Sequence, residues 1–226
     1  MTTGIGQPVC RKEDSRLLVG AGCYSDDVDL PRQARAFVLR SVHAHARIRG
    51  IETAPAKAMR GVLAVLTGSD FKADGLKPIP QDASITVPIE AQRKLPDVIL
   101  INRHGPLPPT PYYPLAVDKV RYVGEAVVLV IAETLAIAKD AAERVEIDYE
   151  PLPSVTETER ASAPDSPALW DGIAANLFLE AEVGDAAATE RAFADAAHVA
   201  RLETWVQRVT GVPMEARTAV GHYDKQ

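Results

Sequence analysis

The clearest hydrophobic pattern in the chain predicts a strand, a helix and a second strand in succession. Residues 126–132, AVVLVIA, are an unbroken apolar run, which is typical of a strand buried on both faces. Residues 133–145 carry apolar side chains at spacings of three and four, which predicts a helix, and Thr134 can cap its first turn. The inner face of this helix carries Leu135, Ala138, Ala142 and Val145. Residues 145–150, VEIDYE, then alternate, so they predict a strand that ends at the prolines of PLP.

An earlier stretch repeats this order of elements. In residues 36–48 an apolar run passes into the alternating HAHARI, and together they predict one long strand whose second half has an exposed face. Residues 54–61 favour a short helix closed by a glycine, and residues 62–68, VLAVLTG, predict another buried strand. Two strand–helix–strand units predict an α/β fold, in which helices pack on a mixed sheet.

A proline-rich stretch, residues 72–120, separates the two units and contains nine of the 17 prolines. Proline biases the residue before it away from helix, so RHGPLPPTPYYP is expected to run extended. A stretch of this length inside a compact domain usually binds, covers or braces something. Two interpretations follow: the stretch docks against its own fold or a partner subunit, or it is a ligand for a proline-recognising protein.

A change of composition marks a second boundary. Residues 156–170, TETERASAPDSPALW, are rich in Ser, Thr, Pro and acids, which is typical of a linker. Beyond it Asp185 can cap a helix over residues 186–197, and residues 198–209, HVARLETWVQRV, predict a strand. The remaining chain is too short for a core of its own, so residues 171–226 are expected to be the incomplete start of a second domain.

Composition excludes some classes of protein. The formal charge of −6, with no evident basic face, argues against a nucleic-acid partner. The longest apolar run, residues 126–132, is far too short to cross a bilayer, and the N-terminus shows no export signal. The two cysteines, Cys10 and Cys23, have neither a disulfide-framework nor a metal-ligand spacing. A cytoplasmic protein is expected.

Two histidines are candidate metal ligands. On a strand, His43 and His45 would share one face, so both imidazoles could reach one zinc ion. A catalytic zinc site needs a third ligand, and the other histidines lie in unrelated contexts. No metal site is therefore predicted.

Four other residues are structural or interface candidates. Gly124 and Glu125 stand at the mouth of a buried strand, where glycine permits close backbone approach and a carboxylate needs partners. Glu125 either braces a cavity wall near a substrate or forms a local hydrogen bond where the strand begins. Glu215 and Arg217, in PMEAR, are candidates for an internal ion pair. No catalytic, cofactor-binding or metal-ligating residue is predicted.

Four segments occur in an order and spacing that resemble one protein family. They are RKEDSRLLVGAGCYSDDVDLP, FVLRSVHAHARIRGIETAPAKAMRGVLAVLTGSD, AVDKVRYVGEAVVLVIAETLAIAKDAAERVEIDYEPLP and VPMEAR. Together they look like the large, molybdenum-binding subunit of the xanthine dehydrogenase and aldehyde oxidase family. The bacterial carbon-monoxide-dehydrogenase-like branch is the most similar, and the match runs over most of residues 7–224.

The resemblance implies a domain organisation and a chemistry. Residues 1–155 would be an α/β hammerhead domain, residues 156–170 a linker, and residues 171–226 the start of a molybdopterin-binding domain. Family enzymes hydroxylate aldehydes or N-heterocycles with oxygen from water, or oxidise carbon monoxide, at a molybdenum held by molybdopterin cytosine dinucleotide. Electrons leave through iron–sulfur and FAD subunits.

The family residues that hold the pterin and perform the reaction would lie in later sequence. This chain is therefore expected to bind no cofactor alone, and to act as an inactive scaffold until the rest of the molybdopterin-binding subunit completes it. The alternative is a stand-alone protein-binding module that uses residues 72–120.

Overall fold

The computed structural model describes most of the chain. The described residues are 6, 11–80, 107–180, 184–207, 209–213 and 217–224. The chain divides into two compact units, one formed by Met1–Gln33 with Ala200–Gln226 and the other by Ala34–Val199. The second unit contains both sheets.

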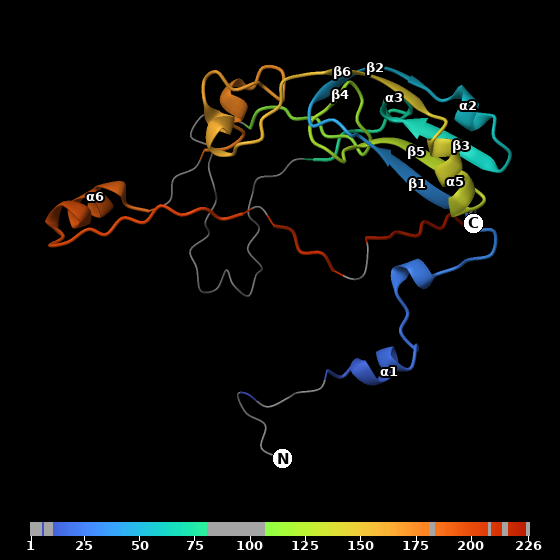
Figure 1. Ribbon diagram of the computed structural model, residues 1–226, viewed down its shortest axis with the longest axis horizontal. Coiled ribbons are helices and arrows are strands. Elements are labelled where there is room, and N and C mark those ends of the chain that lie inside the picture. The colour runs from blue at the N-terminus through green and yellow to red at the C-terminus, as the bar shows by residue number, and fades with distance from the viewer. Residues whose placement is uncertain are drawn as a thin grey trace. The chain divides into compact units, whose positions relative to one another are not determined.

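The first sheet is built around its most apolar strand. β5 (Ala126–Ala132) lies between β1 (Arg35–Arg40) and β3 (Val62–Thr67), and both pairings are antiparallel (Figure 1). The fully buried side chains of β5 include Val127, Val128 and Val130. An entirely apolar strand suits this central position, because neighbours on both edges leave none of its length at the rim of the sheet. The strand predicted over residues 126–132 is confirmed.

The second sheet has the order β4-β2-β6 and is also antiparallel. Its central strand is β2 (Ala46–Glu52), which pairs with β4 (Lys119–Val120) and β6 (Glu146–Pro151). Ala46 pairs with Val120 on one side and with Pro151 on the other. Through β2, this sheet therefore joins the end of the proline-rich stretch to the strand predicted over residues 145–150.

Three helices flank the first sheet. α5 (Leu135–Ala142) packs on β1, β5 and β3, and α2 (Ala54–Lys57) and α3 (Gly68–Ala73) contact β3. As predicted, the hydroxyl of Thr134 caps α5 by accepting a hydrogen bond from the backbone N–H of Ile137 at 3.2 Å.

The inner face of α5 consists of alanines. Ala138, Ala141 and Ala142 are buried, and such small side chains allow the helix to approach the sheet closely. Leu135, which the spacing places on this face, is instead substantially exposed at the first residue of the helix.

Residues 36–48 do not form the one long strand that the sequence predicts. β1 ends at Arg40, and β2 begins at Ala46 in the other sheet. Between them the Ser41 hydroxyl accepts a hydrogen bond from the His43 N–H and donates one to the His43 carbonyl, both at 3.0 Å. These side-chain hydrogen bonds offer the backbone an alternative to the sheet ladder, and the chain changes direction here. Alternation of apolar and polar residues cannot reveal such a turn, because both halves have a strand pattern.

The α/β class is confirmed, but the single mixed sheet is not what forms. All pairings between the described strands are antiparallel, and the strands are divided between two sheets. α5 connects β5 to β6, yet these two strands lie in different sheets, so the connection creates no parallel pair.

The described ends of the proline-rich stretch belong to the fold. Ile79 and Tyr112, both within the stretch, form an isolated antiparallel bridge. Leu115 and Ala116 are buried, and the Ala116 N–H donates to the Ala126 carbonyl in β5 at 2.8 Å. These contacts agree with docking of the stretch against its own fold. The intervening residues 81–106 lie outside the described residues.

The remaining helices are short and carry little buried surface. In the second unit, η2 (Glu159–Ser162) and η3 (Ala174–Asn176) precede α6 (Ala186–Asp195). As predicted, the Asp185 carboxylate caps α6 by accepting a hydrogen bond from the backbone N–H of Ala188 at 2.8 Å. Along the described residues no helix is long and apolar enough to span a membrane.

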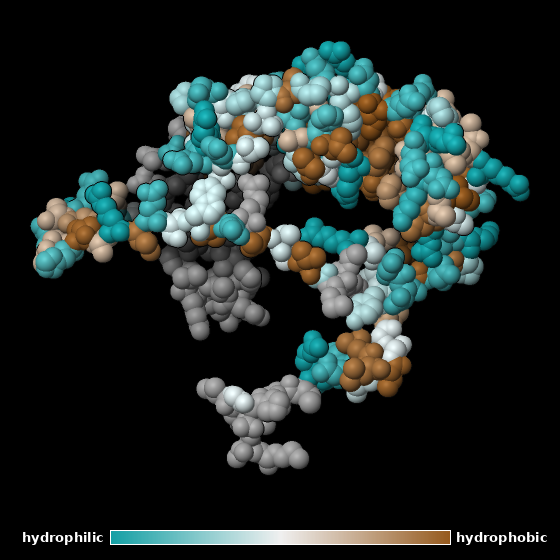
Figure 2. All heavy atoms as spheres, in the orientation of Figure 1, coloured by the Kyte–Doolittle hydropathy of each residue, from teal (hydrophilic) through white to brown (hydrophobic). Residues whose placement is uncertain are grey.

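The unit that contains both ends of the chain has two short helices among its described residues. These are α1 (Asp14–Leu18) and η1 (Ser25–Asp27), and hydrophobic side chains lie at the surface of α1 (Figure 2). The strand predicted over residues 198–209 is wrong for its described part, which has no regular secondary structure. A strand needs a hydrogen-bonded neighbour, and none of the described strands pairs with this segment.

Candidate functional site

The turn before β5 depends on Gly124. Its φ is +89°, a conformation that glycine adopts without strain. The Gly124 N–H donates to the Ser41 carbonyl at 2.8 Å, and its own carbonyl accepts a hydrogen bond from Arg40 Nη1 at 2.9 Å. The turn is thereby tied to the end of β1, and it directs the next residue, Glu125, into the protein.

Glu125 is only 4% exposed, and its carboxylate accepts a hydrogen bond from the backbone N–H of Arg121. This is the local bond at the strand entrance that one of the two interpretations expected, although Glu125 also lines a polar pocket. Burial raises the pKa of the Glu125 carboxyl, and the hydrogen bond and charge of Arg121 oppose this shift.

Arg121 connects this turn to the end of the predicted linker, at Leu169 and Trp170. Its guanidinium stacks on the Trp170 ring, with Cζ 3.7 Å from the ring centroid. Nε donates to the Leu169 carbonyl at 3.2 Å, and Nη1 donates to the Lys119 carbonyl at 3.1 Å. Burial lowers the pKa of Arg121, and the charges of Asp118 and other nearby carboxylates oppose this effect.

A salt bridge adds a second connection. Lys119 Nζ lies 2.6 Å from Asp171 Oδ1; the lysine side chain is 5% exposed and the aspartate side chain 80% exposed. The hydrogen bond from Lys119 lowers the pKa of Asp171. Because the lysine is buried in β4, its charge needs this partner.

Asn176 organises the segment that Arg121 and Lys119 hold. Its Oδ1 accepts from the Leu169 N–H at 2.9 Å, and its Nδ2 donates to the carbonyls of Ala161 and Pro167 at 3.0 and 2.9 Å. Asn176 has φ +51°, a left-handed conformation that asparagine tolerates better than most residues. The last part of the predicted linker therefore has a defined local structure.

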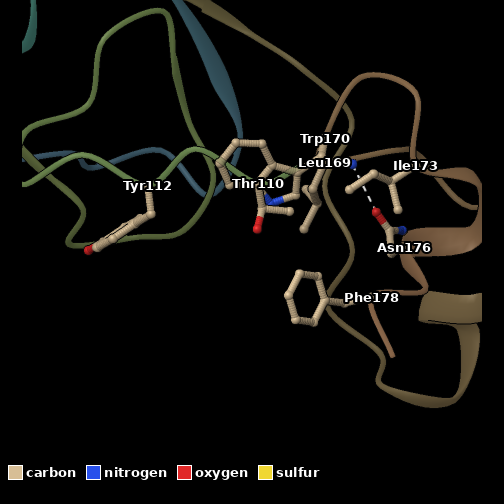
Figure 3. A pocket seen from close by; sticks show the side chains of 7 residues that line it. All are labelled: Thr110, Tyr112, Leu169, Trp170, Ile173, Asn176 and Phe178. Carbon is tan, nitrogen blue, oxygen red and sulfur yellow. Dashed lines mark hydrogen bonds between the residues drawn. The ribbon is translucent and has the colours of Figure 1, made fainter. Parts of the chain in front are cut away.

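Two pockets meet at this junction. The polar pocket has a volume of about 320 Å³, and its charged lining residues are Lys72, Asp118, Arg121, Glu125 and Asp171. The apolar pocket has a volume of about 310 Å³ and is lined by Thr110, Tyr112, Leu169, Trp170, Ile173, Asn176 and Phe178 (Figure 3). Tyr112 and Trp170 line both pockets and separate a charged surface from an uncharged one.

The described residues do not fit a molybdopterin dinucleotide. The polar pocket offers two cations but also three carboxyl groups, and carboxylates oppose the phosphates of such a group. In the apolar pocket, both Nδ2 protons of Asn176 and one acceptor position of its Oδ1 are already used within the protein. We therefore assign no cofactor contact to this junction.

The two histidines lie between β1 and β2 and not on a strand. His45 is buried, and its Nδ1 lies 2.7 Å from the Pro153 carbonyl, while its Nε2 is buried without a hydrogen-bond partner. The His43 ring packs against Tyr149, with 4.8 Å between centroids. Within the described ranges no three His, Cys, Asp or Glu side chains are arranged to hold a metal ion.

The structure brings together only part of the predicted candidate set. Gly124 and Glu125 are adjacent at the junction, Arg217 is exposed, and Glu215 lies outside the described residues, so their ion pair remains a prediction. The sequence analysis missed Lys119, Arg121 and Asn176. A single tryptophan in an otherwise polar linker was the available signal, because a large aromatic side chain usually needs something to pack against.

A pair of antiparallel sheets with flanking helices defines the architecture, and sequence comparison identifies its family. A family described as "aldehyde oxidase and xanthine dehydrogenase, a/b hammerhead domain" matches residues 19–87 and 92–153, more than half of the chain. The chain belongs to this family.

Curated relatives are much longer than this chain. The carbon monoxide dehydrogenase large chain of Afipia carboxidovorans is 34% identical over 98% of this chain and 26% of its own length. The 6-hydroxypseudooxynicotine dehydrogenase complex subunit gamma of Paenarthrobacter nicotinovorans is 36% identical over 96% of this chain and 25% of its own length. The chain thus spans about a quarter of the relatives that it matches.

Solved structures show the same relationship. Reconstituted CO dehydrogenase from Oligotropha carboxidovorans superposes with a TM-score of 0.65 at 34% identity, over 86% of this chain and 23% of that one. Quinoline 2-oxidoreductase from Pseudomonas putida 86 gives a TM-score of 0.57 at 34% identity, over 77% and 20% of the two chains. The predicted family and its hammerhead fold are confirmed.

Proposed function

We propose that this chain is a structural scaffold for a molybdenum hydroxylase large subunit, in which the molybdopterin active site lies on polypeptide other than these 226 residues. In this proposal residues 1–155 are the hammerhead domain, residues 156–170 the linker, and residues 171–226 the start of a molybdopterin-binding domain. The chain alone is inactive, and it becomes part of an oxidoreductase when the remainder of the subunit is present.

One observation carries the proposal: residues beyond Asp185 present large apolar side chains to solvent. Trp205 is 75% exposed, and Leu202 and Val206 are exposed further. α6 has no buried residue at all. Because exposed apolar surface of this kind marks a contact with another surface, this region is expected to be covered by further polypeptide.

Relatives suggest the chemistry and the partners. One solved relative is a Cu,Mo-CO dehydrogenase, and another relative is a subunit of a dehydrogenase complex. By this analogy the complete protein would hold molybdopterin cytosine dinucleotide, work with iron–sulfur and FAD subunits in the cytoplasm, and hydroxylate aldehydes or N-heterocycles or oxidise carbon monoxide. The stand-alone binding module is not carried further, since the end of the proline-rich stretch is bonded to its own fold: β4 pairs with β2, and the Ala116 N–H donates to the Ala126 carbonyl.

The experiment is to produce the 226-residue chain in a host that makes the molybdenum cofactor. Molybdenum content is measured by mass spectrometry, and dye reduction is measured with aldehydes, N-heterocycles and carbon monoxide. We expect far less than one molybdenum per chain and no turnover. Limited proteolysis should remove residues after Asp185 first and leave residues 34–80 and 107–153 intact. Stoichiometric molybdenum with substrate-dependent dye reduction would overturn the proposal, as would protease resistance beyond Asp185.

A further inference from the structure

The apolar pocket at the junction has the features of a small-ligand site. Its volume of about 310 Å³ lies within the range of natural ligand pockets. Three aromatic rings, those of Tyr112, Trp170 and Phe178, contribute to its wall, and none of its described lining residues carries a charge. In Figure 3, Tyr112 lies at one side of the pocket and Ile173 at the other. An uncharged, aromatic lining favours a neutral, flat, apolar ligand.

The wall of this pocket is held in place by groups outside it. Asn176 fixes the backbone of Leu169 through its Oδ1, the hydrogen bond drawn in Figure 3. Arg121, which lines the polar pocket and not the apolar one, fixes the Leu169 carbonyl and stacks on Trp170. The pocket is therefore preorganised, which lowers the entropic cost of binding.

Thr110 contributes a polar group to the pocket that has no internal role. Unlike Asn176, the Thr110 hydroxyl makes no hydrogen bond to any residue that the structure describes. A hydroxyl in this position can donate a hydrogen bond to a ligand or accept one from it. Thr110 would thus orient a ring that carries one polar substituent.

We propose that this pocket binds a neutral bicyclic aromatic molecule with one hydrogen-bonding group, which pairs with the Thr110 hydroxyl. The size argument is direct: a dry cavity of about 150 Å³ accommodates benzene, so roughly twice that volume suits two fused rings. The proposal does not depend on the proposed scaffold function, because it concerns a pocket that this chain forms by itself.

The test uses 2-naphthol as the probe and the full 226-residue chain with Trp205→Phe, which leaves Trp170 as the reporter. Binding is followed by Trp170 fluorescence and by saturation-transfer NMR. For a ligand of this size we expect a Kd of about 10 µM to 1 mM. The anion 2-naphthoate should bind at least tenfold more weakly, because the pocket offers no cation to pair with it.

Variants at Thr110 distinguish this site from general adhesion to exposed apolar surface. Thr110→Trp fills the pocket and should abolish binding, while Thr156→Trp, a matched change at an exposed threonine, should leave it unchanged. Because each variant adds a second tryptophan, its binding is followed by saturation-transfer NMR and not by fluorescence. Thr110→Val keeps the shape and should weaken 2-naphthol several-fold but not naphthalene, and it serves if Thr110→Trp does not fold. The proposal is overturned if 2-naphthol fails to bind at about 2 mM, a concentration above the expected Kd. It is also overturned if both Thr110 variants bind 2-naphthol as tightly as the parent chain does.

Discussion

Replacing Gly68 by alanine tests how tightly the proline-rich stretch is seated against the first sheet. Gly68 begins α3, and a Cβ placed there would lie 2.4 Å from the carbonyl oxygen of Ala116 and 2.7 Å from that of Leu115. Both neighbours are backbone atoms, so no side-chain rotation relieves the clash. The stretch would have to move away from the helix.

The structure gives the cost of that movement. Leu115 and Ala116 are buried, and the Ala116 N–H donates to the Ala126 carbonyl at 2.8 Å. Overpacking costs about 1–3 kcal/mol, and loosening this hydrogen bond adds about 1 kcal/mol. We therefore expect Gly68→Ala to lower the free energy of unfolding by about 2–4 kcal/mol, or the melting temperature by about 4–16 °C.

The assay is urea and thermal unfolding followed by far-UV circular dichroism. Gly50→Ala is the matched control, because a Cβ at Gly50 in β2 meets no atom within 4 Å. It should change stability by less than about 1 kcal/mol. Equal stabilities for the two variants would show that the close approach at Gly68 does not exist, and the docking of the stretch would need another explanation.

Three further predictions concern the junction. Asn176→Ala removes three side-chain hydrogen bonds and should cost about 2–4 kcal/mol of local stability, seen as faster amide exchange at Leu169. Asn176→Asp keeps the acceptor but turns an oxygen toward the Ala161 and Pro167 carbonyls, so it should not restore the stability, and unchanged exchange in both variants would contradict the role. Arg121→Lys removes the planar stack on Trp170 and should lower the free energy of unfolding by about 1–2 kcal/mol. In a Trp205→Phe background it should also shift the fluorescence emission of Trp170 to the red, and an unshifted spectrum would count against the stack. Burial raises the pKa of Glu125 above its ordinary 4.5. Between the unfolded-state pKa and the raised folded-state pKa the folded chain therefore binds more protons than the unfolded chain, so stability should fall as pH rises through this range. Glu125→Gln should flatten this part of a plot of urea midpoint against pH, and parallel plots for the variant and the parent would refute the assignment.

Much of the fold follows from local pattern. β5, the Thr134 cap of α5 and the Asp185 cap of α6 were all predictable, because an apolar run and a capping residue act through nearby positions. The break between β1 and β2 was not, since a strand pattern continues through Ser41 while the pairing partners change. Partner choice between strands is a long-range property, and periodicity contains no information on it.

The junction was only half accessible from the sequence. A glycine and a carboxylate at the mouth of a strand drew attention to Gly124 and Glu125, because such residues need a local reason. Arg121 and Asn176 gave no such signal. Arg121 becomes important only because Leu169, 48 residues further on, folds over it, and Asn176 because the chain turns back to the Ala161 carbonyl 15 residues earlier. That geometry is set by contacts that a local pattern does not contain.

The central position of β5 has a consequence for folding during synthesis. Arg35 at the start of β1 pairs with Ala132, so about 100 residues of chain must be synthesised before that pairing can form, which takes on the order of 5–20 s. β3 waits for the same strand. On the ribosome, both outer strands of this sheet therefore emerge before their pairing partner. A nascent chain halted before Ala126 would leave β1 and β3 unpaired, and unpaired strands promote aggregation.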